Sequence, residues 1–292
     1  MPNTKRNVLA KNKISLNNEE NVNYSQNTSV TNPKVIPLWN QIYCGDAIET
    51  MRGWEDNVFQ ICITDPPYNI AKKGKKGLAW SFSKHVTMSE KWDKFNSNEE
   101  YELFTETWLK EVCRIVKPNG NIFIFGSYHN IYNIGAVAKR MGLRIINSII
   151  WAKPNAQPNI TCRMFTESTE QIIWICNNSE KKATKWTFNY KEMKELNHGK
   201  QMRNYWEIPL TPKREKSFGK HPSQKHLKLM ERLVLAGSEE NDIVLDCFSG
   251  SGSTLLACEI FKRRWVGIEK DDEYNQIAKS RIEELTNQMR LD

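Results

Sequence analysis

The sequence of 292 residues predicts an α/β fold, a mixed and mostly parallel β-sheet with helices on both faces. Two observations carry this prediction: short apolar runs of strand length recur along the chain, and segments with helical periodicity separate them. Strands that alternate with helices in this way are typical of parallel sheets with helical crossovers. The length suits one large domain, and the sequence shows no internal repeat.

The predicted elements begin near Val35. Residues 1–35 are rich in Asn, Ser, Lys and Glu and contain few large apolar side chains, so burial cannot offset the entropy of ordering them. We therefore expect a flexible polar tail at residues 1–35 and one folded domain at residues 36–292. The expected strands are residues 58–64, 121–126, 143–151, 171–176, 243–247 and 265–269, and the expected helices are residues 99–116, 131–141, 225–236, 253–261 and 272–285.

The tetrapeptide Asp65–Pro66–Pro67–Tyr68 follows the first expected strand, at the edge where open α/β sheets bind ligands. The prolines hold the backbone extended and remove two N–H donors, while their carbonyl groups can still accept hydrogen bonds. The segment therefore offers a carboxylate, a carbonyl group and an aromatic ring, but no nucleophile and no general acid. A rigid turn in which Asp65 is only a local cap is the alternative interpretation.

These groups suit the activation of an exocyclic amine on a nucleobase. Such an amine is a poor nucleophile because its lone pair is delocalised into the ring. Acceptance of its hydrogens by Asp65 and the Pro66 carbonyl would localise the lone pair, and Tyr68 could stack on a base flipped out of a helix. Direct in-line transfer of a methyl group from a sulfonium would then need only positioning and electrostatics.

A glycine turn connects the expected strand at residues 243–247 to the helix that follows. Gly250 and Gly252 allow the backbone to approach a ligand closely, and Ser253 and Thr254 are expected to cap the helix. Taken alone, a Gly-x-Gly turn fits a purely structural role equally well.

Two acidic residues favour a nucleoside cofactor with a cationic end. Asp246 opens the turn, where a carboxylate suits a cation and would repel a phosphate, and Glu269 ends the next expected strand, where it can bind a ribose diol. The third glycine of a pyrophosphate-binding fingerprint is missing, which disfavours a nicotinamide oxidoreductase. S-adenosylmethionine fits, because it carries an ammonium, a sulfonium and a ribose.

Composition narrows the remaining classes. A net charge of +8 suits a phosphate-rich partner, although charge alone also fits mere solubility. No apolar run is long enough to cross a bilayer and residues 1–13 contain no apolar signal core, so we expect a cytoplasmic protein. The seven cysteines include no Cys-x-x-Cys pair and are expected to be buried reduced thiols without a metal.

Together these residues resemble the amino-methyltransferases that act on DNA. In that family Asp-Pro-Pro-Tyr is the catalytic motif, and a strand ending in Asp-x-Phe-x-Gly-x-Gly, which here includes Phe248, holds S-adenosylmethionine. The catalytic motif comes first, as in the β class, which implies a circularly permuted, Rossmann-like methyltransferase fold and a possible homodimer. Asp46 matches a position near the cofactor adenine, and residues 164–170 match a segment beside the base pocket. The family's His-Pro-Thr-Gln-Lys, at the methionine end of the cofactor, matches His221, Pro222, Ser223, Gln224 and Lys225.

Residues 126–132, 162–166 and 199–203 are similar to the second adenine methyltransferase of GATC-specific, DpnII-type restriction systems. This resemblance implies site-specific methylation of adenine N6 in duplex and also single-stranded DNA, within a restriction–modification system. The sequence departs from the family pattern at Ser223, His226 and Cys247, where the family has Thr, Pro and Pro. None of these departures removes a polar group that the mechanism needs.

Two basic segments are expected to contact DNA. A mobile loop at residues 71–98 can bind phosphates and close as a lid, and a target-recognition insert at residues 177–220 interleaves basic and aromatic side chains. A solvated loop and an insert with aromatics packed on the sheet are the alternatives, and we expect some of these aromatics to be core. The predicted DNA contacts are Lys72, Lys73, Lys75, Lys76, Arg163, Lys200 and Arg203.

Other functions stay open to different degrees. Methylation of cytosine N4 would use the same mechanism, and the choice of adenine depends on the family resemblance alone. Methylation of cytosine C5 is disfavoured because it needs a nucleophilic cysteine, normally in Pro-Cys, and no Pro-Cys occurs here. A DNA-binding module with a vestigial site is disfavoured by the intact Asp65, Tyr68, Asp246 and Glu269. RNA remains an alternative substrate.

Overall fold

The strands of the described chain form one central sheet. The computed structural model describes residues 33–69, 95–178 and 185–291. Its strands are β1 (Gln41–Cys44), β2 (Phe59–Thr64), β3 (Val116–Gly126), β4 (Arg144–Ala152), β5 (Thr169–Cys176), β6 (Tyr205–Glu207), β7 (Ile243–Asp246) and β8 (Arg264–Glu269). Its α-helices are α1 (Ala47–Arg52), α2 (Asn98–Ile115), α3 (Ile131–Arg140), α4 (Tyr190–Leu196), α5 (Leu227–Gly237), α6 (Ser253–Ile260) and α7 (Asp272–Met289).

The sheet has the order β1–β8–β7–β2–β3–β5–β4–β6. Strand β5 is antiparallel to both of its neighbours, whereas every other pair of adjacent strands is parallel. The predicted mixed and mostly parallel sheet is therefore confirmed. Because β5 runs in reverse, the residues at its start lie at the same edge of the sheet as the residues that end β3 and β4.

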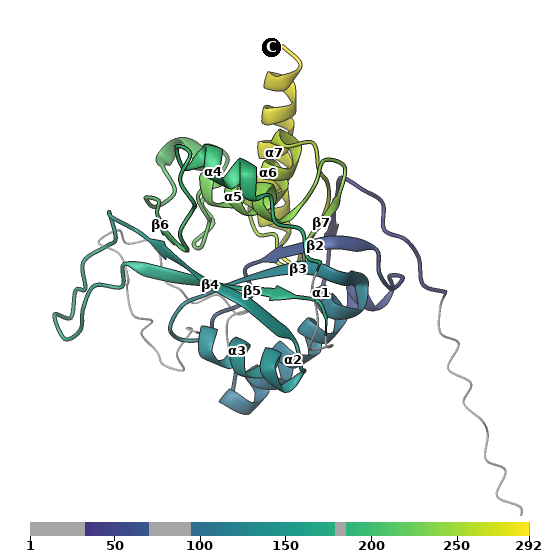
Figure 1. Ribbon diagram of the computed structural model, residues 1–292, viewed down its shortest axis with the longest axis horizontal. Helices are drawn as coiled ribbons and strands as arrows, with labels where there is room; N and C mark the ends of the chain where they lie inside the picture. Colours follow the sequence, from purple (N-terminus) through teal and green to yellow (C-terminus); the bar gives the residue numbers. More distant parts are fainter. Residues whose placement is uncertain (1–32, 70–94, 179–184, 292) are drawn as a thin grey trace, which may run out of the picture. The chain divides into compact units, whose positions relative to one another are not determined.

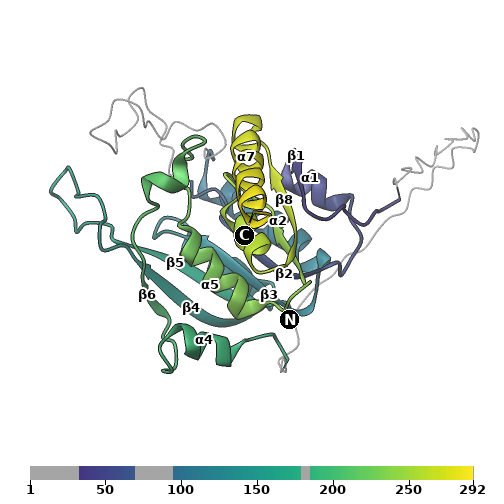
Figure 2. The same ribbon diagram turned by 90° about the horizontal axis from the view of Figure 1, so that it is seen from above.

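Helices cover both faces of the sheet (Figure 1). Helices α1, α2 and α3 pack on one face around Trp108 and Ile134, against Cys62 of β2. Helices α5 and α6 pack on the other face, where Leu229 contacts a cluster that includes Ile63 of β2. Figure 2 views the molecule from the side of α5 and α7. Burial of both faces explains why the central strands are almost continuously apolar in sequence.

Every strand and helix expected from the sequence is present, with ends that differ by a few residues. The short elements β1, β6, α1 and α4 were not predicted, because three to seven residues are too few to show a period. Strands β1 and β6 are also the two edges of the sheet, where β1 has no fully buried residue and β6 has only one, Trp206. Within the described ranges, no helix is long and apolar enough to span a membrane.

Two local predictions about helix starts were wrong. Helix α5 begins at Leu227, because His226 is extended and its imidazole accepts a hydrogen bond from the Lys228 N–H at 3.2 Å; Lys225 is therefore outside the helix. Helix α6 has Gly252 as its N-cap, in the left-handed region at φ 77° and without a side-chain cap.

The side chains of Ser253 and Thr254 therefore do not cap α6. The Ser253 hydroxyl instead donates to the Lys225 carbonyl at 2.9 Å, within a buried contact. The expectation of buried cysteines was also wrong for two of the seven, because Cys44 and Cys162 are exposed. All seven are free thiols, in agreement with the predicted absence of disulfides.

Candidate active site

Four acidic residues stand in a row at the carboxyl ends of four adjacent strands. Asp46 follows β1, Glu269 ends β8, Asp246 ends β7 and Asp65 follows β2. Neighbouring strands are about 4.8 Å apart, so the row extends over about 14 Å. It borders a cavity of about 500 Å³. This is the edge at which open α/β sheets bind ligands.

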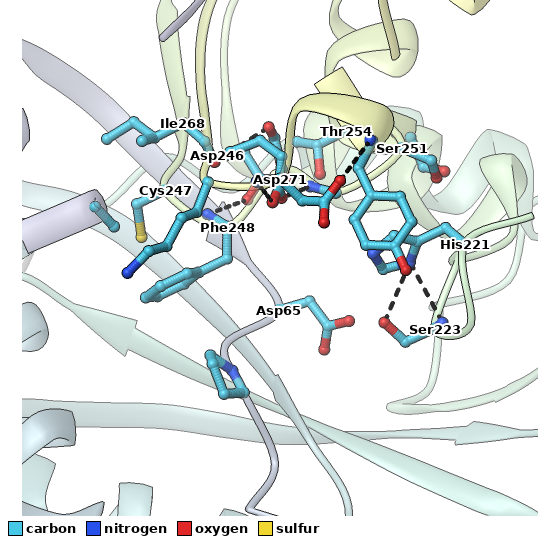
Figure 3. Close-up of a pocket in the computed structure, with 18 of the residues that line it drawn as sticks. Asp65, His221, Ser223, Asp246, Cys247, Phe248, Ser251, Thr254, Ile268 and Asp271 are labelled. Carbon is cyan, nitrogen blue, oxygen red and sulfur yellow. Dashed lines mark hydrogen bonds between the residues drawn. The ribbon is translucent and has the colours of Figure 1, made fainter. Parts of the chain in front are cut away.

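Most of the residues predicted to bind the cofactor line this cavity. They are Asp46, Asp65, His221, Ser223, Gln224, Lys225, Asp246, Phe248, Gly250, Ser253, Thr254 and Glu269. Pro222 and Gly252 are not among the lining residues, and of the catalytic tetrapeptide Asp65 and Pro67 line the cavity whereas Pro66 and Tyr68 do not. In Figure 3 the Asp65 side chain extends toward Ser223 and His221.

The Asp246 carboxylate is buried without a cationic partner among the described residues. Its Oδ1 accepts hydrogen bonds from the Thr64 hydroxyl at 3.1 Å and the Phe248 N–H at 3.2 Å. Burial raises the pKa of Asp246 to about 7, against the opposing effect of these hydrogen bonds. Raising a pKa from 3.8 to about 7 corresponds to about 4 kcal/mol of unfavourable ionisation, which a bound cation can offset.

Glu269 is oriented by backbone groups. Its Oε2 accepts from the Gly250 N–H and its Oε1 from the Asp271 N–H, both at 2.8 Å. Burial raises the pKa of Glu269, and no cation within the described ranges forms an ion pair with it. Each carboxylate oxygen keeps a further lone pair for a ligand hydroxyl.

The imidazole of His221 contributes no charge to the cavity. Burial, reinforced by the Lys225 charge, lowers the pKa of His221 to about 3, so the ring is neutral. Its Nδ1 accepts a hydrogen bond from the Ser223 N–H at 3.3 Å, and its ring lies edge-on to Tyr274 at 4.3 Å. A Cβ on Gly250, which has φ 50°, would stand 3.0 Å from His221 Nε2. The glycine turn and the histidine therefore fit one another only without a side chain at Gly250.

Asp46 closes the far end of the row. Its Oδ1 accepts from the Ile48 and Glu49 N–H groups and so caps helix α1. Its Oδ2 lies 3.4 Å from Lys270 Nζ, in an exposed ion pair. Exposed pairs of this kind contribute little free energy, so this side chain can exchange partners readily.

At the other end of the cavity, both oxygens of the Asp65 carboxylate are occupied. Oδ1 accepts from the Tyr68 hydroxyl at 2.6 Å, and Oδ2 lies 2.5 Å from Lys225 Nζ. Burial raises the pKa of Asp65, although the Lys225 charge opposes the rise. For Lys225 burial acts to lower the pKa, but the charges of Asp65 and Glu170 outweigh it and raise the value.

A buried chain of hydrogen bonds fixes the tetrapeptide Asp65–Tyr68. The Tyr101 hydroxyl donates to the Pro67 carbonyl at 2.8 Å, and Asn130 Nδ2 donates to the same hydroxyl at 3.2 Å. Asn130 Oδ1 in turn accepts from the Ser127 N–H at 2.9 Å. The Pro66 carbonyl accepts no hydrogen bond from the described residues.

Two further charged residues complete this end of the site: Glu170 belongs to the segment that the resemblance placed beside the base pocket, without a role of its own, and Lys153 was missed by sequence reasoning. Glu170, in β5, accepts from the Tyr68 hydroxyl at 3.2 Å and lies 3.4 Å from Lys225 Nζ. Lys153, directly after β4, lies 3.2 Å from Glu170 Oε1. Burial acts to raise the pKa of Glu170, but the two ammonium groups outweigh it and lower the value. A lysine directly after an apolar strand was the available signal, because lysine is rarely buried without a partner.

Three of the residues predicted to contact DNA lie within the described ranges. Arg163 is exposed in the segment between β4 and β5, whereas Lys200 and Arg203 line a second cavity of about 440 Å³ beside β6. In that cavity the Arg232 guanidinium lies over the Trp206 ring at 4.8 Å, and Trp206 is core, as expected of some aromatics in this insert. Lys72, Lys73, Lys75 and Lys76 lie outside the described residues.

The search for a candidate metal site covers the part of the chain that the structure describes. Within those ranges, no cluster of three His, Cys, Asp or Glu side chains is arranged to hold a metal ion.

Known proteins are similar to this chain in sequence and in fold. The model of a family described as DNA methylase, of the N6/N4 type, matches residues 59–280. The Type II methyltransferase M2.DpnII of Streptococcus pneumoniae is 41% identical over 239 residues, which cover 82% of this chain and 87% of the relative. The Type II methyltransferase M2.MboI of Moraxella bovis is 38% identical over 248 residues, covering 84% and 88%. Among solved structures, the M1.HpyAVI–SAM complex has a TM-score of 0.61 and 30% identity, covering 83% of this chain and 98% of that chain.

Proposed function

The chain belongs to the N6/N4 family of DNA methylases, and we propose that it transfers the methyl group of S-adenosylmethionine to N6 of adenine in DNA. The similarity to M2.DpnII and M2.MboI confirms the resemblance that residues 126–132, 162–166 and 199–203 indicated. The observation that carries the proposal is the row of acidic residues along one cavity, which ends at Asp65. A cofactor bound along this row would reach the catalytic tetrapeptide.

The cavity fits a cationic nucleoside. Asp246 is buried and Glu269 is half-buried, both without a cationic partner in the described ranges, and His221 is neutral, so a ligand with positive charge would offset the unfavourable ionisation of the two carboxylates. In this assignment Glu269 binds the ribose hydroxyls, Asp46 lies near the adenine, and the segment His221–Lys225 lies at the methionine end. S-adenosylmethionine supplies the methyl group, made electrophilic by the sulfonium.

The residues of the chain then need only to position and polarise the target amine. Asp65 and the free Pro66 carbonyl accept the two amine hydrogens, which localises the nitrogen lone pair. With S-adenosylmethionine bound, the methyl group would pass to this nitrogen while the carbon–sulfur electron pair stays on sulfur, and Asp65, which accepts one of the amine hydrogens, would take the proton that the methylated nitrogen must lose. Tyr68, held through its hydroxyl, presents a ring on which a flipped base can stack.

Finer assignments follow from the family and the site. We assign the fold to the circularly permuted β class, because the catalytic strand β2 precedes the cofactor strand β7 in the chain. Lys200 and Arg203 are proposed to contact DNA within a target-recognition insert, with Arg163 beside the base pocket. GATC as the target, a restriction–modification role in the cytoplasm and a homodimer are proposed on the resemblance to DpnII-type enzymes.

A labelled transfer experiment tests the function. The protein is incubated with methyl-labelled S-adenosylmethionine and unmethylated DNA, and the DNA is then digested to nucleosides. We expect the label in N6-methyladenosine. Label in N4-methylcytidine would assign the same chemistry to cytosine, and the absence of transfer to DNA would overturn the proposal. A duplex with one GATC site and a matched duplex without it then test the target.

A further inference from the structure

A cation lies where the proposed reaction needs the target amine. Lys225 Nζ lies 2.5 Å from Asp65 Oδ2, and both side chains line the cavity. The other donor to Asp65, the Tyr68 hydroxyl, does not belong to a cavity-lining residue. An amine that approaches Asp65 through the cavity therefore competes with Lys225 and not with Tyr68.

A second acceptor for the displaced ammonium is already in place. Glu170 Oε2 lies 3.4 Å from Lys225 Nζ, too far for a strong charge-assisted hydrogen bond but close enough to become one after a small rotation. Lys153 Nζ, only 9% exposed, is 3.2 Å from the other oxygen, Oε1. Lys153 thus anchors Glu170 through Oε1, while Oε2 accepts a hydrogen bond from the Tyr68 hydroxyl at 3.2 Å and keeps further acceptor capacity for Lys225.

We propose that Lys225 occupies the place of the target amine in the free protein, and that Glu170 accepts its ammonium when the base enters. Glu170 is then a positioning residue, because it acts on Asp65 through Lys225 and does not touch the reacting atoms. This role rests on the proposed function, since the amine bound to Asp65 is the substrate of that reaction.

The balance of charges favours a shift of the Lys225 ammonium from Asp65 to Glu170 over its removal from the site. Asp65, Glu170, Lys153 and Lys225 make two carboxylates and two ammonium groups, and a nucleobase is neutral. A shift of Lys225 from Asp65 to Glu170 keeps this balance, whereas removal of the ammonium would leave a buried carboxylate unpaired, which is strongly unfavourable. The ring of Phe125, whose centroid is 5.4 Å from Lys225 Nζ, also favours a cation that stays in this position.

Base entry can be measured without catalysis. A DNA duplex carries 2-aminopurine next to the target adenine, whose 6-amino group stays intact, and the rise in 2-aminopurine fluorescence on titration with protein reports the loss of stacking as the adenine leaves the helix. Glu170→Gln keeps the shape of the side chain and removes its charge. We expect it to weaken base extrusion about tenfold, the loss typical of one charge-assisted hydrogen bond. Glu170→Asp, which keeps the charge, should recover part of this loss.

The matched control is Glu111→Gln. Glu111 is a partly buried glutamate, 20% exposed against 16% for Glu170, and it forms an ion pair with Arg114 at 2.7 Å on helix α2. We expect this variant to leave base extrusion unchanged. Thermal unfolding of both variants measures any general loss of stability.

A double-mutant cycle with Lys225→Met separates a positioning role from a structural one. Without Lys225 there is no ammonium to accept, so Glu170→Gln should change base extrusion less than twofold in that background. Lys225→Met alone should still extrude the base, because the amine gains the Asp65 oxygen that Lys225 held, and the lost ion pair should lower the stability of the fold instead. An equal loss from Glu170→Gln in both backgrounds, or no loss in the wild-type background, would overturn the proposal. So would a folded Lys225→Met protein that extrudes no base.

Failure of the proposed function has a different signature. If the wild-type protein transfers no methyl group to DNA, the function is wrong whatever the cycle gives. If the wild type transfers methyl groups and the Glu170→Gln variant behaves as the wild type in both assays, only the role of Glu170 is wrong.

Discussion

The two ends of the cavity both contain buried carboxylates, but they balance the charge in opposite ways. At the end formed by the glycine turn, Asp246 and Glu269 are bonded to backbone N–H groups and a hydroxyl, and no described cation pairs with them. At the end formed by the tetrapeptide, Asp65 and Glu170 are each paired with an ammonium group. The first end is therefore suited to a cationic ligand and the second to a neutral one.

This difference matches the two substrates of the proposed reaction. S-adenosylmethionine carries positive charge, and a nucleobase carries none. A buried carboxylate without a cationic partner is unfavourable. Such a carboxylate beside a cavity therefore indicates a ligand that supplies the missing positive charge. We therefore expect different effects from variants at the tetrapeptide end and at the glycine-turn end of the cavity.

The largest effect is expected at the tetrapeptide. Asp65→Ala removes the acceptor that localises the amine lone pair, and we expect it to abolish methyl transfer while cofactor binding survives. Transfer of labelled methyl groups and calorimetric titration with S-adenosylmethionine measure the two properties separately. Retained transfer would refute the mechanism, and joint loss of transfer and binding would show that the two ends are not independent.

A smaller effect with the opposite selectivity is expected at the glycine turn. Asp246→Asn keeps the volume of the side chain and removes the charge that a cationic ligand would offset. We expect the affinity for S-adenosylmethionine to fall by about tenfold or more, the size of one charge-assisted interaction. Extrusion of the target adenine in the absence of cofactor, reported by a neighbouring 2-aminopurine, should stay as in the wild type. An unchanged cofactor affinity would contradict the charge comparison.

The smallest effect is expected from a steric change at the same end. Gly250→Ala places a Cβ 3.0 Å from His221 Nε2 at a residue with φ 50°. The backbone strain and the displaced imidazole should destabilise the folded protein by about 1 kcal/mol and weaken cofactor binding a few-fold. Thermal unfolding with and without S-adenosylmethionine measures both. A matched substitution is Gly142→Ala, where φ is 76° but no atom lies within 4 Å, so only the strain remains.

The residues at the cofactor end of the cavity could be predicted from the sequence because each one is placed by the short segment in which it lies. Asp246 and Glu269 each end an apolar run, and parallel strands bring such ends to one edge of the sheet. The charged groups around Asp65, namely Lys225 and Glu170, are by contrast far from it in the sequence. Glu170 reaches Asp65 only because β5 is inserted in reverse between β3 and β4, where Glu170 pairs with Trp151 and its neighbours. Neither the position nor the direction of that strand follows from its apolar run.

Lys225 shows a related limit. The resemblance placed it at the methionine end of the cofactor, and it does line the cavity, but its nearest partner is the catalytic carboxylate. The caps of α6 were mispredicted for a more local reason. The left-handed conformation of Gly252 starts the helix, which leaves the Ser253 hydroxyl for a tertiary contact. Spacing in the sequence identifies which residues are near an edge, whereas their partners depend on strand order and backbone conformation.

The charge comparison is tested most directly by the protons released when the cofactor binds. Because the pKa of Asp246 is raised to about 7, the carboxyl is largely neutral below this pH and ionised above it. A cation favours the ionised form, so cofactor affinity should rise with pH up to about 7, and binding at pH 7 should release about half a proton. Calorimetric titrations in buffers of different ionisation enthalpy measure this number. We expect proton release in the wild type and its loss in Asp246→Asn. Binding without proton release in the wild type would contradict the role of the Asp246 charge in cofactor binding.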